Sequence, residues 1–228
     1  MRFCRLLPLA ALLLFASCSN QTQSARETFT QHHSDGRVKP SVHVTPVRDL
    51  SGAQMPWSLS EEFDASISSS LLTDGSLYVM PREATETALA KLENPRLDSK
   101  RNDLISLFAP SEFLVELELV RHDEKQITDQ TKIPAHMQGE AVKAIHVEMR
   151  VRLFDLRLSR PKMLLQEIVS VEHFVDQNKT ATNYHVNALG TKGYSKTPLG
   201  IAHAKLAEDV AERIEHYVAI AKSRPNAE

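Results

Sequence analysis

Two stretches in the second half of the chain alternate between apolar and polar residues. In the first, Phe113, Val115, Leu117 and Leu119 recur at every second position, and a similar alternation runs from Ile145 to Leu153. A two-residue period predicts strands with one buried and one more polar face, as is common in antiparallel sheets. A third strand is expected at about residues 163–175, so that the last two strands form a long hairpin. The polar residues 123–140 are interpreted as a long hairpin loop.

The first half of the predicted globular region reads as strand, helix, strand, helix. An apolar-rich stretch begins at residue 41, and a helix is expected from residue 58, where Ser58 and Glu61 have the spacing of a capping box. Every fourth residue of that helix is apolar, which predicts one buried stripe. A short strand at residues 76–80 and a helix at residues 81–92, opened by Pro81, follow. The buried stripe consists of Leu59, Phe63, Ile67 and Leu71.

The chain turns helical again from Leu199 to the end of the globular region. Apolar residues from Ala202 to Ala221 follow one face of this segment, and charged residues occupy the other positions. Packing on the sheet explains this stripe better than a coiled coil, because the apolar spacing spans only about three heptads. The expected fold class is therefore α/β (α+β): a single mixed β-sheet flanked by helices, which starts β-α-β-α and continues with a long antiparallel hairpin and a C-terminal amphipathic helix.

A different apolar pattern occupies the amino terminus. Arg2 and Arg5 precede an apolar run of residues 6–16, and Ala16-Ser17 stand directly before Cys18. The run is too short to span a bilayer, which needs about 20 apolar residues, but it fits a cleaved signal peptide. The small residues before Cys18 resemble the bacterial lipobox, in which cleavage between Ser17 and Cys18 is followed by acylation of the cysteine. The alternative is an ordinary secretory signal with an incidental cysteine.

Composition changes this picture little. Cys4 and Cys18 are the two cysteines of the chain, so that the mature protein has no disulfide available. Loss of Arg2 and Arg5 with the signal peptide leaves 25 basic residues against 29 acidic ones, a formal charge of −4. A mildly acidic chain lacks the basic footprint expected of a nucleic-acid-binding protein.

Three regions are thus predicted: a signal peptide at residues 1–17, a lipidated Cys18 with a flexible tether at residues 18–40, and one α/β domain at residues 41–224. The tether is polar and poor in large aliphatic residues, so burial could not offset the backbone entropy lost on ordering. His32 and His33 within it are interpreted as solvated residues, because no further ligands accompany them at metal-binding spacing.

No local motif points to catalysis or to a cofactor. The chain lacks a GxSxG elbow, a phosphate-binding glycine loop and an HExxH metal site. The paired carboxylates Glu61-Glu62 and Glu116/Glu118 have spacings that ordinary solvated faces also produce. His146 and His173 lie on the two strands of the predicted hairpin and could become neighbours there, but two or three converging ligands are too few for a metal site. We therefore expect a non-catalytic protein with no cofactor and no metal.

Three segments resemble a known group of envelope proteins. Residues 44–52 (VTPVRDLSG), 76–82 (SLYVMPR) and 151–155 (VRLFD) are similar to strands of the group that includes the curli-secretion lipoprotein CsgG, the penicillin-binding-protein activator LpoB and the TolB amino-terminal domain. The resemblance implies a lipid-anchored periplasmic adaptor. It also implies a protein partner in the periplasm, such as a peptidoglycan synthase. The position after the cysteine is Ser19 rather than Asp, which favours the outer membrane.

Two alternatives to the adaptor remain open: a subunit of an envelope secretion or assembly complex, and an unrecognised hydrolase. For a binding protein, contact surfaces are expected on the long polar loops at residues 123–140 and 176–198. The second loop carries aromatic residues of the kind that interface hot spots favour. These candidate partner-binding residues are Tyr184, His185 and Tyr194.

Overall fold

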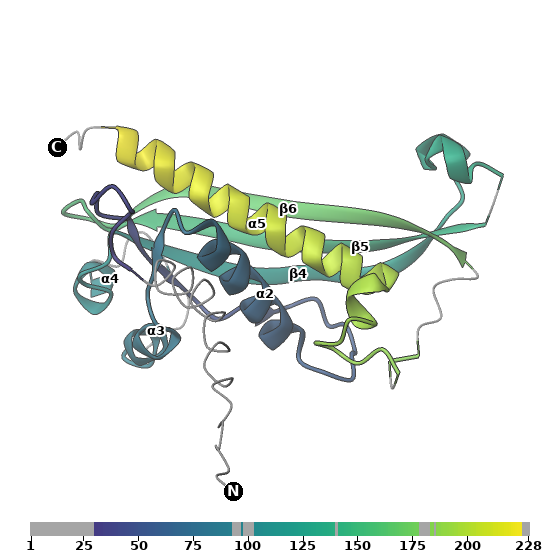
Figure 1. Cartoon of the computed structure of the whole chain (residues 1–228), viewed down its shortest axis with the longest axis horizontal. Helices are drawn as coiled ribbons and strands as arrows, with labels where there is room; N and C mark the ends of the chain where they lie inside the picture. Colours follow the sequence, from purple (N-terminus) through teal and green to yellow (C-terminus); the bar gives the residue numbers. More distant parts are fainter. Residues whose placement is uncertain are drawn as a thin grey trace, which may run out of the picture.

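The computed structural model describes residues 30–92, 97, 103–139, 141–177, 183–184 and 186–224. Long strands and a long C-terminal helix dominate it (Figure 1). The strands are β1 (Ser41–Val44), β2 (Arg48–Asp49), β3 (Tyr78–Val79), β4 (Phe113–Ile127), β5 (Val142–Asp155) and β6 (Lys162–Asp176). The α-helices are α2 (Leu59–Asp74), α3 (Arg82–Leu89), α4 (Asp103–Leu107) and α5 (Pro198–Ser223), and the 3₁₀ turns are η1 (Gln130–Lys132), η2 (Ala135–Met137) and η4 (Tyr194–Lys196).

These strands form one mixed six-stranded sheet. Its order is β3-β1-β4-β5-β6, and β2 pairs with β4 beside β1. β1 runs parallel to β3 and β4, whereas β4, β5 and β6 form an antiparallel meander. The expected single mixed sheet with a long β5–β6 hairpin is confirmed.

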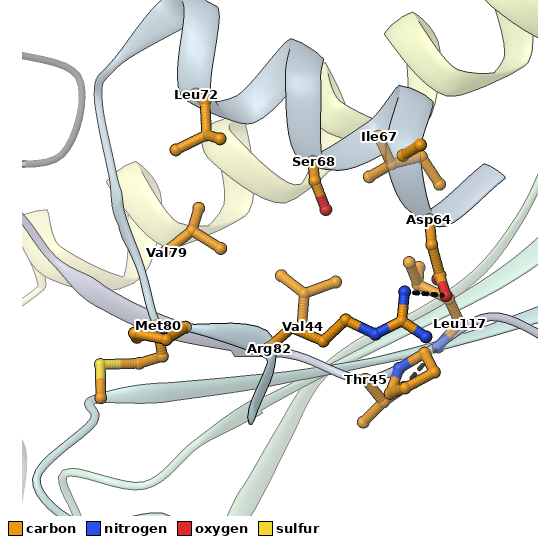
Figure 2. A pocket seen from close by; sticks show the side chains of 13 residues that line it. Val44, Thr45, Asp64, Ile67, Ser68, Leu72, Val79, Met80, Arg82 and Leu117 are labelled. Carbon is orange, nitrogen blue, oxygen red and sulfur yellow. Dashed lines mark hydrogen bonds and ion pairs between the residues drawn. The ribbon is translucent and has the colours of Figure 1, made fainter. Parts of the chain in front are cut away.

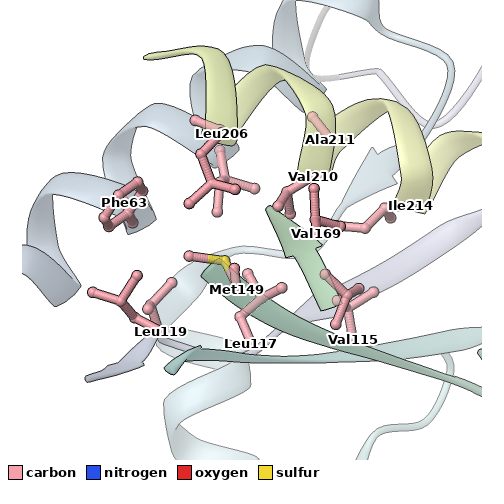
Figure 3. Packing of buried hydrophobic residues seen from close by; sticks show 14 of the residues in the cluster. Phe63, Val115, Leu117, Leu119, Met149, Val169, Leu206, Val210, Ala211 and Ile214 are labelled. Carbon is pink, nitrogen blue, oxygen red and sulfur yellow. The ribbon is translucent and has the colours of Figure 1, made fainter. Parts of the chain in front are cut away.

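The main core lies between one face of the sheet and helices α2 and α5. Leu117 and Met149 from the strands meet Phe63 of α2 and Leu206 of α5 in this layer (Figure 3). All four predicted stripe residues of α2 are buried. Burying a side chain of this size contributes about 1.5 to 3 kcal/mol, so the layer is the main source of stability.

A second, smaller core lies on the opposite face of the sheet, at the end where α3 and α4 pack (Figure 1). Leu114 and Phe154 point to this face and contact Leu104 and Phe108 of the α4 segment. Helix α4 could not be predicted from the sequence, because five residues are too few to show a helical period. The two cores explain why Leu114 and Phe154 are apolar although they alternate with the main-core residues.

Helix α2 begins and ends at the residues that its caps specify. The backbone N–H of Glu61 donates to Oγ of Ser58 at 3.2 Å, which satisfies one free amide of the first turn. Gly75 ends the helix with a φ of 68°, a left-handed conformation that glycine adopts without steric cost. The cap at Ser58 was expected from the sequence.

Strand β4 continues further than the sequence indicated. A loop was predicted from residue 123, but residues 123–127 still pair with residues 142–146 of β5, so the loop begins after Ile127. The side chains of Glu124, Lys125 and Gln126 are exposed. Because three successive side chains are exposed, no apolar alternation marks this end of β4, which pairs with β5 through its backbone.

Part of the predicted tether is described. Residues 30–40 include a turn in which the N–H of His33 donates to the carbonyl of Arg37, and a bridge joins His32 to Val38. The predicted signal peptide and most of the tether lie outside the described residues.

Candidate functional site

A pocket of about 350 Å³ lies between α2 and the strands β1 and β3 (Figure 2). Most of its lining is aliphatic and comes from both walls: Ile67 and Leu72 from α2, and Val44 and Val79 from the strands. Ligand pockets in proteins have this size and character, with a few polar groups that fix orientation. The remaining lining residues are Thr45, Pro46, Asp64, Ala65, Ser68, Met80, Pro81, Arg82 and Leu117.

One end of the pocket is charged. Oδ1 of Asp64 accepts a hydrogen bond from the backbone N–H of Val47 at 2.6 Å, and Oδ2 lies 3.4 Å from Nη1 of Arg82. The guanidinium makes its shorter contact elsewhere, because Nε of Arg82 donates to Glu86 at 2.7 Å. The carboxylate is therefore held in place by the backbone and only loosely neutralised by arginine.

Local sequence explains this placement. Asp64 and Ser68 are four residues apart on α2, so that both face the pocket, while the neighbouring Phe63 faces the core. Arg82 is the first residue of α3 and follows Pro81, which ends the segment that leaves β3. Burial raises the pKa of the Asp64 carboxyl, against the Val47 hydrogen bond and the charge of Arg82, which lower it.

A second polar group lies inside the main core. Oε1 of Glu62 accepts hydrogen bonds from Nδ1 of His203 at 2.8 Å and from the hydroxyl of Tyr194 at 2.5 Å, and Oε2 accepts from Nε1 of Trp57 at 2.7 Å. Nε2 of His203 lies 2.8 Å from Nε2 of His122 on β4. This Glu62 network thus joins α2, α5, β4 and the η4 turn. Glu62 is 5% exposed and His203 is 2% exposed.

The surroundings shift the pKa values of Glu62 and of His122, in opposition to the effect of burial for Glu62 and in line with it for His122. Burial alone would raise the pKa of Glu62, but hydrogen bonds and charge from His203, with hydrogen bonds from Tyr194 and Trp57, bring it below its usual value. The pKa of His122 is lowered by burial and then by the neighbouring His203. A bulge in β4 makes the contact possible: the register shifts between Leu119 and Arg121 and directs His122 to the helix side, opposite Val147.

A third polar group lies on the other face of the sheet. Glu116 and Glu118, 5% and 2% exposed, contact arginines from neighbouring strands. Arg152 donates to Glu116 at 2.6 Å, Arg150 donates to Glu118 at 2.5 Å, and Arg48 of β2 also pairs with Glu118. The interpretation of Glu62, Glu116 and Glu118 as parts of solvated faces was wrong, because their partners come from distant segments that local spacing does not reveal.

The structure describes two of the three predicted partner-binding residues, and they differ in exposure. Tyr194 is 7% exposed and belongs to the Glu62 network, so its side chain is not a surface contact. Tyr184 is partly exposed and packs edge-on against Trp57, with ring centroids 5.2 Å apart. His185, Ser17 and Cys18 lie outside the described residues. Partner binding itself stays a prediction.

The histidines of the hairpin do not meet. His146 lies opposite Glu172, and His173 lies opposite Ile145, so the two imidazoles point to opposite faces. Within the described ranges, no group of three or more His, Cys, Asp or Glu residues has the arrangement of a metal site. No helix in the described part of the chain has the length and apolar character needed to cross a membrane.

Residues 28–222 match DUF7499, a family of unknown function, and the chain belongs to that family. No curated protein matches the chain significantly. Among solved structures, the chain is similar to the hypothetical protein CT253 from Chlamydia trachomatis, with 26% identity and a TM-score of 0.62 over 79% of this chain and 98% of that one. This match shows that CT253 has a similar fold.

Weaker similarity links the chain to two solved lipoproteins. Lipoprotein GNA1162 from Neisseria meningitidis is 14% identical, with a TM-score of 0.40 over 76% of this chain and 99% of that one. A minor lipoprotein from Acinetobacter baumannii is 8% identical, with a TM-score of 0.36 over 84% of this chain and 98% of that one.

Proposed function

We propose that the protein is a bacterial envelope lipoprotein that is anchored through Cys18 and acts by binding rather than by catalysis. The observation that carries the proposal is the arrangement at the amino terminus, where the basic and apolar segments end at Ala16-Ser17-Cys18. Acyl chains contribute about 0.8 kcal/mol for each buried methylene, so an acylated cysteine holds a chain firmly to a membrane. The domain that begins near residue 41 would then face the aqueous side.

Two features of the domain support binding. The acid and base side chains of the Glu62 network are enclosed and are hydrogen-bonded to one another, which is how a structural polar cluster is arranged. The pocket beside α2 is open to a ligand and mostly aliphatic. A hydrolase would need a nucleophile and a base within reach of a substrate, whereas Glu62 and His203 both lie inside the main core.

The finer proposal is an outer-membrane lipoprotein that faces the periplasm and contacts a protein there, as an LpoB-like activator of a peptidoglycan synthase would. Ser19 after the cysteine and the polar tether support this location and reach. A subunit of an envelope assembly complex is the alternative. Native mass measurement of the membrane-extracted protein separates the two, because an assembly subunit is expected as a symmetric oligomer and an adaptor as a monomer with its partner.

The anchor is tested by the Cys18→Ser variant in a bacterial host, with Cys4→Ser as the matched control. Cys4 lies within the predicted signal peptide, so its replacement removes a thiol without touching the lipidation site. We expect Cys18→Ser to abolish labelling by a radioactive fatty acid and to move the protein from the membrane to the soluble fraction. Cys4→Ser is expected to behave as the natural sequence does.

Membrane association and acylation that survive in Cys18→Ser would refute the anchor. Release without loss of acyl label would place the lipid on another residue and would also refute it.

A further inference from the structure

We propose that the pocket between α2 and the strands β1 and β3 binds a small ligand that carries one ammonium group on an apolar body. The proposal rests on the pocket's geometry and charge and does not depend on the lipid anchor. Figure 2 shows the aliphatic side chains around the cavity and the Asp64–Arg82 pair at one end.

One oxygen of the Asp64 carboxylate can accept a hydrogen bond from a ligand. Oδ1 is occupied by the backbone N–H of Val47 at 2.6 Å, which fixes the orientation of the group. Oδ2 lies 3.4 Å from Nη1 of Arg82, which is longer than a strong ion pair, since charge-assisted N–H···O bonds measure about 2.7 to 2.9 Å. An ammonium group at this end could donate a shorter hydrogen bond to Oδ2.

The charge around this end favours a cation. The carboxylates of Glu86 and Glu61 and the guanidinium of Arg82 all lie near enough to act on the charge of Asp64. Arg82 is also engaged by Glu86 at 2.7 Å. Among these four groups, three carboxylates outnumber one guanidinium, and an excess of negative charge attracts a cation and repels an anion.

The rest of the pocket suits an apolar body. Val44, Ile67, Leu72, Val79 and Leu117 surround the cavity, and its volume of about 350 Å³ lies at the lower end of the range for ligand pockets. A ligand of this kind would bury its hydrocarbon part against both walls while its ammonium group reaches Asp64. A fully polar cation would gain nothing from the aliphatic lining.

The test is a titration of the ¹⁵N-labelled full chain in detergent with hexylamine, with hexanoate and hexanol as probes of equal length. We expect hexylamine to shift the amide resonance of Val47 in a saturable way, because that N–H donates to Asp64. Asp64→Asn should weaken hexylamine roughly tenfold or more, since it removes the charge and keeps an acceptor for Val47. Asp209→Asn, on the exposed side of α5, is the matched control and should leave the affinity unchanged.

Chemical denaturation of Asp64→Asn shows whether the variant is folded before it is titrated. Equal binding of hexylamine and hexanol, stronger binding of hexanoate, or full hexylamine affinity in folded Asp64→Asn would each overturn the proposal. Because the readout is ligand affinity, its failure is distinct from a failure of the Cys18 anchor.

Discussion

Glu62 is the residue on which the interior polar contacts converge. Its two oxygens accept from His203, Tyr194 and Trp57, which belong to three different segments of the chain. A buried carboxylate is costly unless its hydrogen-bonding capacity is met, and here three donors meet it. The interaction therefore specifies how α2, α5 and the η4 turn lie relative to one another.

Glu62→Gln is expected to lower the free energy of unfolding by about 3 kcal/mol, because the amide turns an N–H₂ group toward a donor and removes the charge. Glu61→Gln is the matched control: this neighbouring carboxylate is exposed, and its replacement should change stability by less than about 0.5 kcal/mol. Urea denaturation at pH 7 measures both. Similar losses in the two variants would show that the buried contacts of Glu62 do not stabilise the fold.

His43 should make stability depend on pH. It is 3% exposed, lies 2.7 Å from the hydroxyl of Thr85 and packs against Phe108, and burial lowers its pKa from 6.5 to about 4. The folded state therefore favours the neutral imidazole. The contribution of the neutral His43 side chain to the free energy of unfolding is complete above about pH 6.5, where this imidazole is also neutral in the unfolded chain. The contribution is lost as the pH falls from there toward 4.

The titration of His43 is expected to lower the free energy of unfolding by about 2 kcal/mol at pH 5 relative to pH 7. His43→Gln removes the titrating group, so the difference in stability between pH 7 and pH 5 should shrink by about that amount. Comparing the variant with the natural chain cancels the contributions of Glu62 and His122, whose lowered pKa values act in the same direction. An unchanged difference would contradict the assignment.

At the scale of elements, the start of α5 is fixed by the η4 turn. Oγ1 of Thr197 accepts from the N–H of Gly200 at 3.0 Å, and the chain before it folds back so that a Cβ at Gly200 would overlap the carbonyl oxygen of Tyr194. Glycine is required by this close approach, which in turn places Tyr194 in the Glu62 network. Helix propensity therefore favours alanine at this position, whereas packing favours glycine.

The Gly200→Ala variant shows whether helix propensity or packing has the larger effect on stability. Propensity alone predicts a gain of up to about 1 kcal/mol, because alanine is the better helix former. The overlap with Tyr194 predicts instead a loss of about 1 to 3 kcal/mol as η4 shifts. Thermal unfolding decides between them, with Ile201→Ala at the neighbouring exposed position as control. A stabilised Gly200→Ala would contradict the close approach.

Element boundaries show where local patterns stop being informative. The start of the α2 helix could be predicted to within a residue, because Ser58 is a local signal. The end of β4 could not, since the residues after the bulge no longer alternate between apolar and polar, and their partners lie on β5 and α5. The orientation of the His122 side chain toward the helices has no local sequence signal either, because it follows from the bulge.

The whole molecule uses the two faces of its sheet differently. One face is covered by α2 and α5 over an apolar layer (Figure 3). The other carries α3 and α4 at one end and, further along the strands, the carboxylates of Glu116 and Glu118 paired with arginines. Alternation along a strand explains the division, because successive side chains point to opposite faces. The pocket lies on the α2 side, beside the short β3 edge.

Features that depend on neighbouring residues could be predicted from the sequence alone. Periods of two and of four residues, helix caps and the segment before Cys18 depend on neighbours within a few positions, so they specified the mixed sheet, its flanking helices and the expected anchor. The tertiary structure decided which polar groups are buried together. Glu62 and His203 are 141 positions apart, and Asp64 meets Val47 and Arg82 from other elements. Such contacts arise only when packing brings separate segments together, and no local pattern encodes them.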